Sequence, residues 1–266
     1  MTKAGAPSEI LGGIAGDLST DIERPEVALA IAAHPDDIEF GCGATLAKWA
    51  SAGTRIVHVI CTDGAKGTWD PDADLTALVT RRQAEQRAAS VALGGTGMVA
   101  FLSRVDGELS SDIATRGEVA EIIRRHRPEV VLGHDPWKRY RLHPDHRHAG
   151  WLCVDGVVAA RDPHFFPEQG LAPHRPTAML LFEADQVNHV EVIDEDALER
   201  RCDALVAHRS QWETTHLLRA EQSGEPMGSK EEGIDGFRRR ERRLLSAMGS
   251  LVGAPLGEAF RLMDDL

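Results

Sequence analysis

The chain has 266 residues and a formal net charge of −12, and 42% of its residues are hydrophobic, which suffices for a sizeable core in one large domain or two small ones. The acidic balance argues against binding to nucleic-acid phosphates, and no basic amphipathic segment indicates a membrane surface as partner. The four cysteines are scattered without a CxxC pair, which argues against a disulfide framework and a cysteine-based zinc site.

The first 24 residues are small, polar and rich in glycine, and we expect a flexible leader over 1–24 before one folded domain over 25–266. This leader lacks the basic start and apolar run of a signal peptide, and no apolar stretch in the sequence is long enough to span a bilayer. Together with the cysteine pattern, these features favour a protein of the reducing cytoplasm.

In the first half of the chain, apolar runs alternate with segments of helical periodicity. Residues 27–33 form an uninterrupted apolar run, which is typical of a strand covered on both faces of a sheet. The same reasoning predicts further strands at 55–61 and 98–102 and helices at 44–51 and 79–93.

The second half continues this alternation. Beyond residue 110 the predicted elements are helices at 111–126, after His143 and at 196–208, strands at 130–133, 178–182 and 189–193, and a mobile loop at 221–236. Strands that alternate with helices indicate βαβ units with right-handed crossovers. We therefore predict an α/β fold: a single Rossmann-like domain with a mostly parallel sheet flanked by helices.

Two short motifs with histidine and aspartate follow predicted strands. Residues 34–37 read HPDD directly after the first strand, and residues 143–146 read HPDH in the region after the strand at 130–133. Sites in such sheets form just beyond the carboxyl ends of the strands. The sheet can therefore bring these two motifs together although they are far apart in the sequence.

Jointly, the two motifs supply the groups that metal-dependent amide hydrolysis needs. Zinc accepts imidazole nitrogen and carboxylate oxygen, and a catalytic zinc keeps one position open for water. Two ligands from the first motif and one from the second make such a site, in which the remaining carboxylate accepts a proton from the water. A further histidine can polarise the carbonyl or protonate the leaving nitrogen. Iron or cobalt also suits an N/O site, so zinc is the first expectation and not the only one.

Each motif alone has a simpler interpretation. A lone His-Pro-Asp segment forms a turn in which the aspartate caps the next helix, and for one motif that interpretation is the better one. Two motifs that each stand at a strand end favour the catalytic interpretation.

The sequence resembles the LmbE-like, or PIG-L, family of zinc-dependent N-acetylglucosaminyl deacetylases. The resemblance rests on AHPDDIE at 33–39 and HPDH at 143–146, and it runs in the family's order from about residue 27 to the C-terminus. The weaker matches are TDG at 62–64, RQAE at 82–85, LG at 93–94, DG at 106–107, HRSQ at 208–211 and EAF at 258–260. The resemblance implies an LmbE-like deacetylase domain over 25–266, which hydrolyses the amide of an N-acetylated or otherwise N-acylated glucosamine conjugate.

The resemblance also implies roles for the first-motif residues and for one residue of the second motif. His34, Asp37 and His146 are the implied ligands of a Zn²⁺ cofactor. Asp36 is the implied general base.

Four further roles follow from the resemblance in the same way. His143 is implied to stabilise the oxyanion or protonate the amine, and Asp145 to orient His143 by accepting a hydrogen bond from its ring. Arg82 and Asp106 are implied to contact the substrate. For Arg82, an ion pair with Glu85 on a helix surface is an alternative of nearly equal weight.

The sequence departs from the family pattern at two places, and these leave the physiological substrate open. Some members carry a tyrosine shortly before the second motif, but Tyr140 is displaced by one position from that pattern, so we assign it no catalytic role. The thiol-cofactor branch often has Glu-Ser after the first motif, where this chain has Ile38 and Glu39. The partner is expected to be a small amino-sugar conjugate, and homo-oligomerisation is left open.

Two alternatives compete with an enzyme. A dinucleotide-binding protein is suggested by Gly41, Gly43 and the later Asp63, but seven residues separate the strand from these glycines and Leu46 stands where a third glycine is needed. A non-catalytic sugar-binding relative is the other alternative.

Seven other histidines have no ligand-like spacing, although two of them, His134 and His164, could lie near a pocket rim. The seven are His58, His126, His134, His164, His174, His189 and His216.

Overall fold

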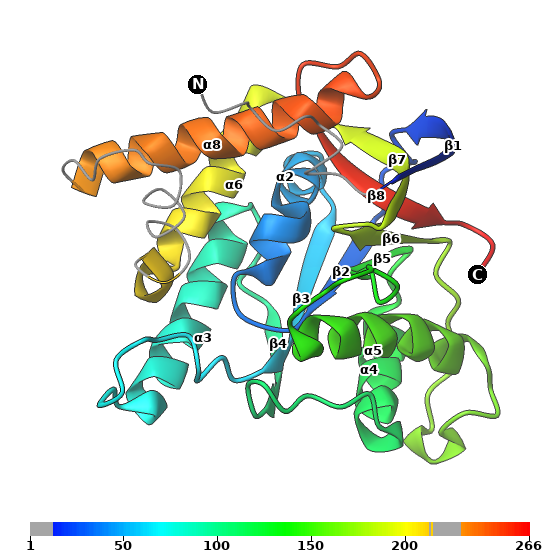
Figure 1. Cartoon of the computed structure of the whole chain (residues 1–266). Helices are drawn as coiled ribbons and strands as arrows, with labels where there is room; N and C mark the ends of the chain where they lie inside the picture. Colours follow the sequence, from blue (N-terminus) through cyan, green and yellow to red (C-terminus); the bar gives the residue numbers. More distant parts are fainter. Residues whose placement is uncertain (1–12, 213, 215–229) are drawn as a thin grey trace.

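The computed structural model describes residues 13–212, 214 and 230–266. One eight-stranded sheet runs through the molecule, with helices on both of its faces (Figure 1). The strands are β1 (Gly13–Thr20), β2 (Val27–Ala32), β3 (Arg55–Thr62), β4 (Val99–Arg104), β5 (Val130–His134), β6 (Ala178–Phe182), β7 (Gln186–Val192) and β8 (Gly257–Met263). The helices are α2 (Asp37–Ser51), α3 (Leu75–Ala92), α4 (Ile113–His126), α5 (Pro144–Arg161), α6 (Glu195–Ala207) and α8 (Lys230–Ser250), with short 3-10 turns η1 (Pro167–Gln169) and η2 (Arg209–Gln211).

The strand order across the sheet is β1-β7-β8-β6-β5-β2-β3-β4. All pairs are parallel except those of β8, which runs antiparallel to β6 and β7. The chain passes from β2 outward to β3 and β4 and then returns to β5 on the other side of β2, so the strand order reverses between β2 and β5. Ligand sites in open α/β sheets lie beyond the carboxyl ends of the strands at such a reversal. The predicted α/β fold with a mostly parallel sheet is confirmed.

β2 packs against helices on both faces. Ala28, Ala30 and Ala32 belong to a core shared with α2, α3 and α6, whereas Leu29 and Ile31 belong to a second core shared with α4 and α5. All five side chains are fully buried. Burying each of the two larger ones contributes about 1.5–3 kcal/mol. This double burial explains why the strand is a continuous apolar run in the sequence.

The edge strand β1 lies within the predicted leader. It pairs parallel to β7, and its side chains are mostly exposed. Backbone hydrogen bonds to an open sheet edge hold most of it, and Leu18 is its side chain that packs against a small apolar cluster of β7 and β8. Residues 1–12 of the predicted leader and residues 221–229 of the predicted mobile loop lie outside the described residues, whereas residues 230–236 begin α8.

A carboxylate from the last strand caps the second half of α2. The helix is interrupted at Cys42, whose φ and ψ of −152° and 19° are not helical. Beyond this kink, the N–H groups of Ala44 and Thr45 donate to the carboxylate of Glu258 on β8, at 3.0 and 2.7 Å. Arg201 of α6 donates to the same carboxylate at 2.5 Å. Anionic groups stabilise helix N-termini, so Glu258 links α2, α6 and β8 in the core.

Candidate metal centre

The HPDD turn follows β2 and is closed by its own last side chain. Oδ2 of Asp37 accepts a hydrogen bond from the backbone N–H of His34 at 2.8 Å, and the N–H of Asp37 donates to the carbonyl of His34 at 3.3 Å. Asp36, between them, has φ 98° and ψ −23°. Such a left-handed conformation is uncommon outside glycine. The turn gives its two adjacent carboxylates different neighbours.

The Asp37 carboxylate lies among three imidazole rings. Nδ1 of His34 is 3.2 Å from Oδ2, and Nε2 of His134, at the end of β5, is 3.3 Å from the same oxygen. Nε2 of His146, in the first turn of α5, is 3.4 Å from Oδ1. The expected contact between the two motifs is therefore present, since His146 and the HPDD turn meet at the switch point between β2 and β5.

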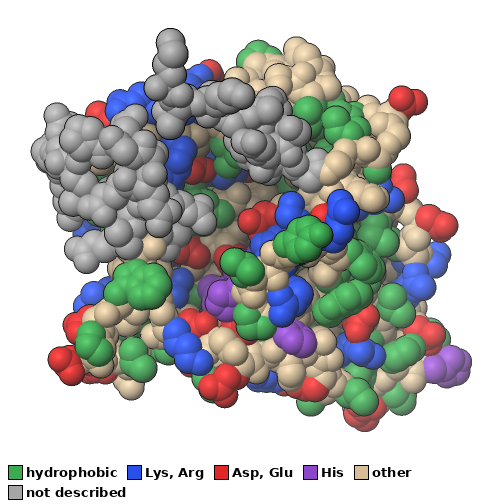
Figure 2. All heavy atoms as spheres, viewed as in Figure 1, with side chains coloured by type: hydrophobic (Ala, Val, Ile, Leu, Met, Phe, Trp, Pro, Cys, Tyr) green, Lys and Arg blue, Asp and Glu red, His purple; other side chains and the backbone are tan. Residues whose placement is uncertain are grey.

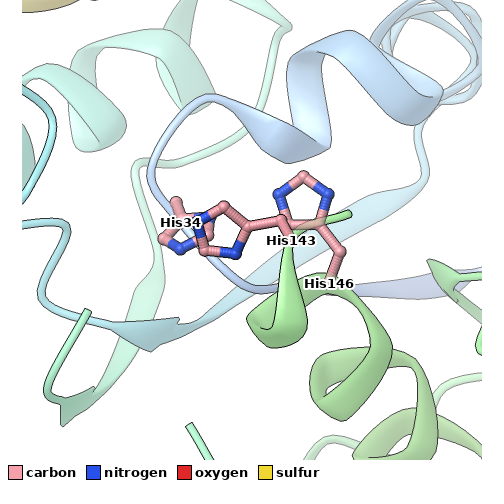
Figure 3. A group of neighbouring side chains, drawn as sticks. All are labelled: His34, His143 and His146. Atoms are coloured by element: carbon pink, nitrogen blue, oxygen red, sulfur yellow. The ribbon is translucent and has the colours of Figure 1, made fainter. Parts of the chain in front are cut away.

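The second motif adds His143 to this cluster. Figure 3 shows His34, His143 and His146 close together where α5 begins, and the rings of His143 and His146 stack with centroids 5.0 Å apart. Around these rings, three overlapping groups of residues have candidate ligand atoms that lie within 4.8 Å of one another. The groups are His34 with His143 and His146; Asp37 with His134 and His146; and His34 with Asp106, His143 and Asp145. The cluster can hold a metal ion.

The protonation states of His146 and Asp37 match a metal site. Burial, aided by the charges of His134 and His34, lowers the pKa of His146 to about 4, which leaves its ring neutral. Burial opposes the charge on Asp37, but the neighbouring histidines outweigh it and hold the pKa of that carboxyl well below its usual range. A neutral imidazole and an ionised carboxylate are the forms that bind metals.

His34 is tied to two carboxylates on its other side. Its Nε2 lies 3.1 Å from Oδ2 of Asp145 and 3.2 Å from Oδ1 of Asp106. Despite burial, these contacts and the one to Asp37 raise the pKa of His34 well above its ordinary value. A histidine that ligates a metal usually donates its second ring N–H to such a carboxylate, so Nδ1 is the nitrogen that faces the cluster.

Asp145 therefore has a different partner from the one expected. The sequence analysis assigned its carboxylate to the ring of His143, but that carboxylate accepts from His34 and from the backbone N–H of Gly107 at 2.6 Å. The bond that joins Asp145 to His143 runs from the backbone N–H of Asp145 to Nδ1 of the ring, at 3.3 Å. His143 is the N-cap of α5, and this bond is its capping bond.

Asp36 is buried beside the cluster without contacting the three imidazoles. Burial raises the pKa of its carboxyl to about 6, although the charge of Arg82, with Nη2 3.8 Å away, opposes the shift. A carboxyl group with a pKa in this range is suited to accept a proton near neutral pH.

A cavity of about 1060 Å³ opens from the cluster, and His34, Asp36, Asp37 and His146 form part of its wall. Figure 2 shows histidine atoms at a hollow near the middle of this face. Away from the cluster the wall is largely apolar side chains with several cationic ones; these include Phe40, Val187, Leu244, Met248, Lys138, Arg141 and Arg243. Ligand pockets commonly combine such an apolar wall with a few placed polar groups.

Comparison with known proteins assigns the chain to a family. The family model described as PIG-L: GlcNAc-PI de-N-acetylase matches residues 29–155. Diacetylchitobiose deacetylase of Thermococcus kodakarensis is 36% identical over 187 residues, which cover 69% of each chain. The chain belongs to the PIG-L family. The predicted resemblance is confirmed.

Other relatives of this PIG-L protein are also deacetylases by name. The 1D-myo-inositol 2-acetamido-2-deoxy-alpha-D-glucopyranoside deacetylase of Streptomyces avermitilis is 33% identical over 166 residues, or 53% of this chain and 56% of that protein. Among solved structures, N,N'-diacetylchitobiose deacetylase from Pyrococcus horikoshii superimposes with a TM-score of 0.76 at 28% identity, and covers 90% of this chain and 84% of that one.

Arg82, a predicted substrate contact, lies beneath the HPDD turn of this PIG-L protein. Its side chain is buried, and its two terminal nitrogens donate to the carbonyls of Pro35 and Gly64 at 2.6 and 2.7 Å. Glu85 instead accepts from the backbone and the hydroxyl of Ser210. The alternative of a surface ion pair between Arg82 and Glu85 is therefore wrong.

His134 belongs to the cluster around Asp37, which the sequence analysis did not predict. It was expected at most at a pocket rim, yet it is fully buried, stacks on His146 with centroids 4.4 Å apart, and has Nδ1 3.4 Å from Glu183. Its position at the carboxyl end of β5, beside β2, was the available signal. His164, the other rim candidate, is exposed in the loop after α5.

The glycines of the rival dinucleotide interpretation lie inside α2. A Cβ at Gly41 would come within 2.4 Å of the Phe182 ring, and one at Gly43 within 3.3 Å of Arg201. These glycines permit close packing of the helix. They do not form the strand-to-helix turn that a pyrophosphate requires.

Proposed function

We propose that this protein is a zinc-dependent hydrolase that removes an N-acetyl group, or another N-acyl group, from a glucosamine-type conjugate. The observation that carries the proposal is one carboxylate surrounded by imidazoles, Asp37, with a second carboxylate of raised pKa, Asp36, next to it in the same cavity wall. Family membership supports the reaction type.

The donor atoms present fit a zinc ion. His34, Asp37 and His146 are the proposed ligands, and His134 is a further nitrogen donor within 3.3 Å of the Asp37 carboxylate. Imidazole nitrogen and carboxylate oxygen are ligands that zinc accepts. The chemistry that a bound zinc ion supplies is the lowering of the pKa of a coordinated water to about 7 in favourable sites and the polarisation of the amide carbonyl.

Asp36 is the proposed proton acceptor. It lines the cavity but makes none of the imidazole contacts of Asp37, so its carboxylate is available to the attacking water. Arg82 donates to the carbonyl of Pro35, the residue before Asp36, and to the carbonyl of Gly64 in the loop after β3, and these bonds limit the movement of the turn. General bases placed in this way contribute about 10²–10⁴-fold to rate.

His143 is the proposed donor to the substrate. Because Nδ1 accepts the N–H of Asp145, the neutral ring carries its proton on Nε2, where it can be donated to the carbonyl oxygen as negative charge develops. Burial and the nearby charge of His34 lower the pKa of His143, so its ring is neutral near pH 7 and protonates the departing amine only after it has itself accepted a proton. The proton that Asp36 takes from the attacking water is the source of that proton. Arg82 remains a predicted contact to the substrate, and Asp106 a predicted contact to its sugar hydroxyls.

A panel of N-acylglucosamine conjugates tests the proposal. We expect amine release from at least one N-acetylated sugar, loss of that activity on chelation, and recovery on addition of Zn²⁺. A zinc-loaded, folded protein that releases no amine from acetylated or longer N-acyl conjugates contradicts it. Activity that survives complete metal removal contradicts the metal assignment alone.

The remaining expectations concern partners and location. Within the described part of the chain, no helix combines the length and apolarity required to cross a bilayer. A small amino-sugar conjugate is the proposed substrate because the named relatives act on such molecules. The lack of a nucleic-acid or membrane-surface partner is proposed from the net charge of −12, and the cytoplasm as location from the scattered cysteines.

A further inference from the structure

Behind the HPDD turn lies a group of polar side chains that the proposed reaction does not use. Glu39 of α2, His58 of β3, Gln86 of α3 and His208 at the end of α6 are all completely buried. Burial of polar and charged groups costs free energy unless they are hydrogen-bonded. Their contacts lead from the core to the backbone of Asp36.

Gln86 makes the contact to Asp36. Its Oε1 accepts the backbone N–H of Asp36 at 2.9 Å, and its Nε2 donates to Oε1 of Glu39 at 2.7 Å. Because an amide nitrogen cannot accept and a carboxylate cannot donate, the two contacts fix which way the Gln86 amide faces. The carbonyl end must point to the turn.

The backbone at Asp36 needs such a partner. A residue other than glycine with φ 98° is strained and persists only where the surroundings impose that conformation. The N–H of Asp36 is also buried, where an unpaired donor is destabilising. The hydrogen bond that this N–H donates to Gln86 offsets both costs, at the residue whose carboxylate is the proposed base.

Glu39 in turn lies between two imidazoles. Its Oε2 is 3.4 Å from Nε2 of His208, and its Oε1 is 3.8 Å from Nδ1 of His58. His208 leads into η2, where Ser210 donates to Glu85, one residue before Gln86 on the buried face of α3. The amide of Gln86 thus donates to a buried carboxylate whose charge two nearby histidines favour.

We propose that Gln86 is a positioning residue for Asp36: its amide, oriented by Glu39 and His208, holds the HPDD turn in the left-handed conformation that presents the Asp36 carboxylate to the cavity. This inference rests on the proposed function, since it concerns the base of that reaction. It assigns a role to α3 and η2, two elements that carry none of the proposed metal ligands.

A double-mutant cycle tests whether Gln86 acts through Asp36. As a single substitution, Gln86→Leu removes the hydrogen-bond acceptor and keeps a side chain of similar volume. We expect kcat to fall by about ten- to a hundred-fold, as for a small misplacement of a catalytic group. KM should stay within about two-fold, and the zinc content should be unchanged. In an Asp36→Asn background, the same substitution should not lower the residual rate further, because the group that it positions is already gone.

Gln83→Leu is the matched control, because Gln83 lies one turn earlier on α3, is only partly buried and, among the described residues, makes no side-chain hydrogen bond to the HPDD turn. Its kcat should equal that of the unsubstituted protein. Equal losses from Gln86→Leu in both backgrounds, or no loss in either, would overturn the inference. If Gln86→Leu does not fold, as judged from its thermal melting, Gln86→Asn and His208→Leu enter the same cycle with the same expectations.

The two proposals fail in different ways. An unsubstituted, zinc-loaded protein without amine-releasing activity overturns the proposed function before any variant is made. An active protein in which Gln86→Leu behaves like Gln83→Leu leaves the hydrolase intact and removes only the positioning role.

Discussion

The fold holds the two motifs of the metal centre differently. In HPDD, the side chains of His34 and Asp36 are buried, and the backbone is bound from below by Arg82 and Gln86. In HPDH, His143 and Pro144 are exposed, and the preceding loop carries Tyr140 and Leu142, which are 94% and 92% exposed.

The contrast separates two tasks of the site. The HPDD turn is supported by α3, so it suits groups whose position decides the rate, namely the proposed metal carboxylate and the proposed base. The HPDH side, at the start of α5, combines one proposed ligand, His146, with a neighbour that is open to solvent, His143. Substrate access and proton delivery fit the exposed side, and preorganisation fits the buried one.

The largest effect is expected on the buried side, at the base. Asp36→Asn should lower kcat by about 10²–10⁴-fold, because it removes the proton acceptor, while zinc content stays at that of the unsubstituted protein. Metal analysis and steady-state kinetics on the same preparation measure both. Asp72→Asn, an exposed surface position, is the control and should be fully active; comparable activity in the two variants would reject the base assignment.

The next effect divides the two histidines of the exposed motif. His146→Ala should lose bound zinc on purification, since a ligand is gone, whereas His143→Ala should retain about one zinc per chain and lose about 10²–10³-fold in kcat. Elemental analysis of both proteins decides the matter. Loss of metal from the His143 variant alone would make His143 the ligand, an arrangement that its place beside His34 and His146 also permits.

A smaller effect is expected from Asp145, which links the two motifs. Asp145→Asn should weaken zinc affinity by about 10–100-fold, because the carboxylate that orients His34 is lost. Competition with a chelator of known affinity measures this without reference to activity. Asp155→Asn, on the same helix and paired with Arg116 on the surface, should bind zinc normally. Unchanged affinity in the Asp145 variant speaks against the orienting role.

The smallest effect is expected at the exposed loop itself. Leu142→Ser should change the free energy of unfolding by less than about 0.5 kcal/mol, as for surface substitutions in general. Leu29→Ala, in the buried strand that leads to HPDD, should cost about 2–5 kcal/mol. Denaturant unfolding of both variants gives the comparison; a large loss from Leu142→Ser would mean that the loop is packed in solution.

Much of the fold follows from local sequence signals. The apolar run of β2 and the elements from β3 to α6 were predicted because two-sided burial and helical periodicity leave marks in the residues themselves. For α2 only residues 44–51 were predicted, although the helix begins at Asp37. β1 leaves no such mark, since it is held by backbone bonds to β7 and has no apolar alternation. Residues 230–236, the last part of the predicted mobile loop, form the start of α8. Charged residues are frequent there and precede the buried positions of the helix.

The residues of the site could be predicted where they belong to a short motif. The partner toward which each side chain points could not. HPDD and HPDH indicated that His34, Asp37 and His146 would meet. The partner of the Asp145 carboxylate depends on how the loop after β4 lies over α5, which brings Gly107 to it, and no local pattern encodes that. The burial of Arg82 likewise depends on the distance between α3 and the turn.

The capping of α2 by Glu258 makes the order of protein synthesis matter. The carboxylate that binds the N–H groups of Ala44 and Thr45 is 214 and 213 residues further along the chain. During synthesis the first motif therefore leaves the ribosome more than two hundred residues before this carboxylate does. Until β8 has been made, the part of α2 beyond the kink at Cys42 lacks the group that caps it.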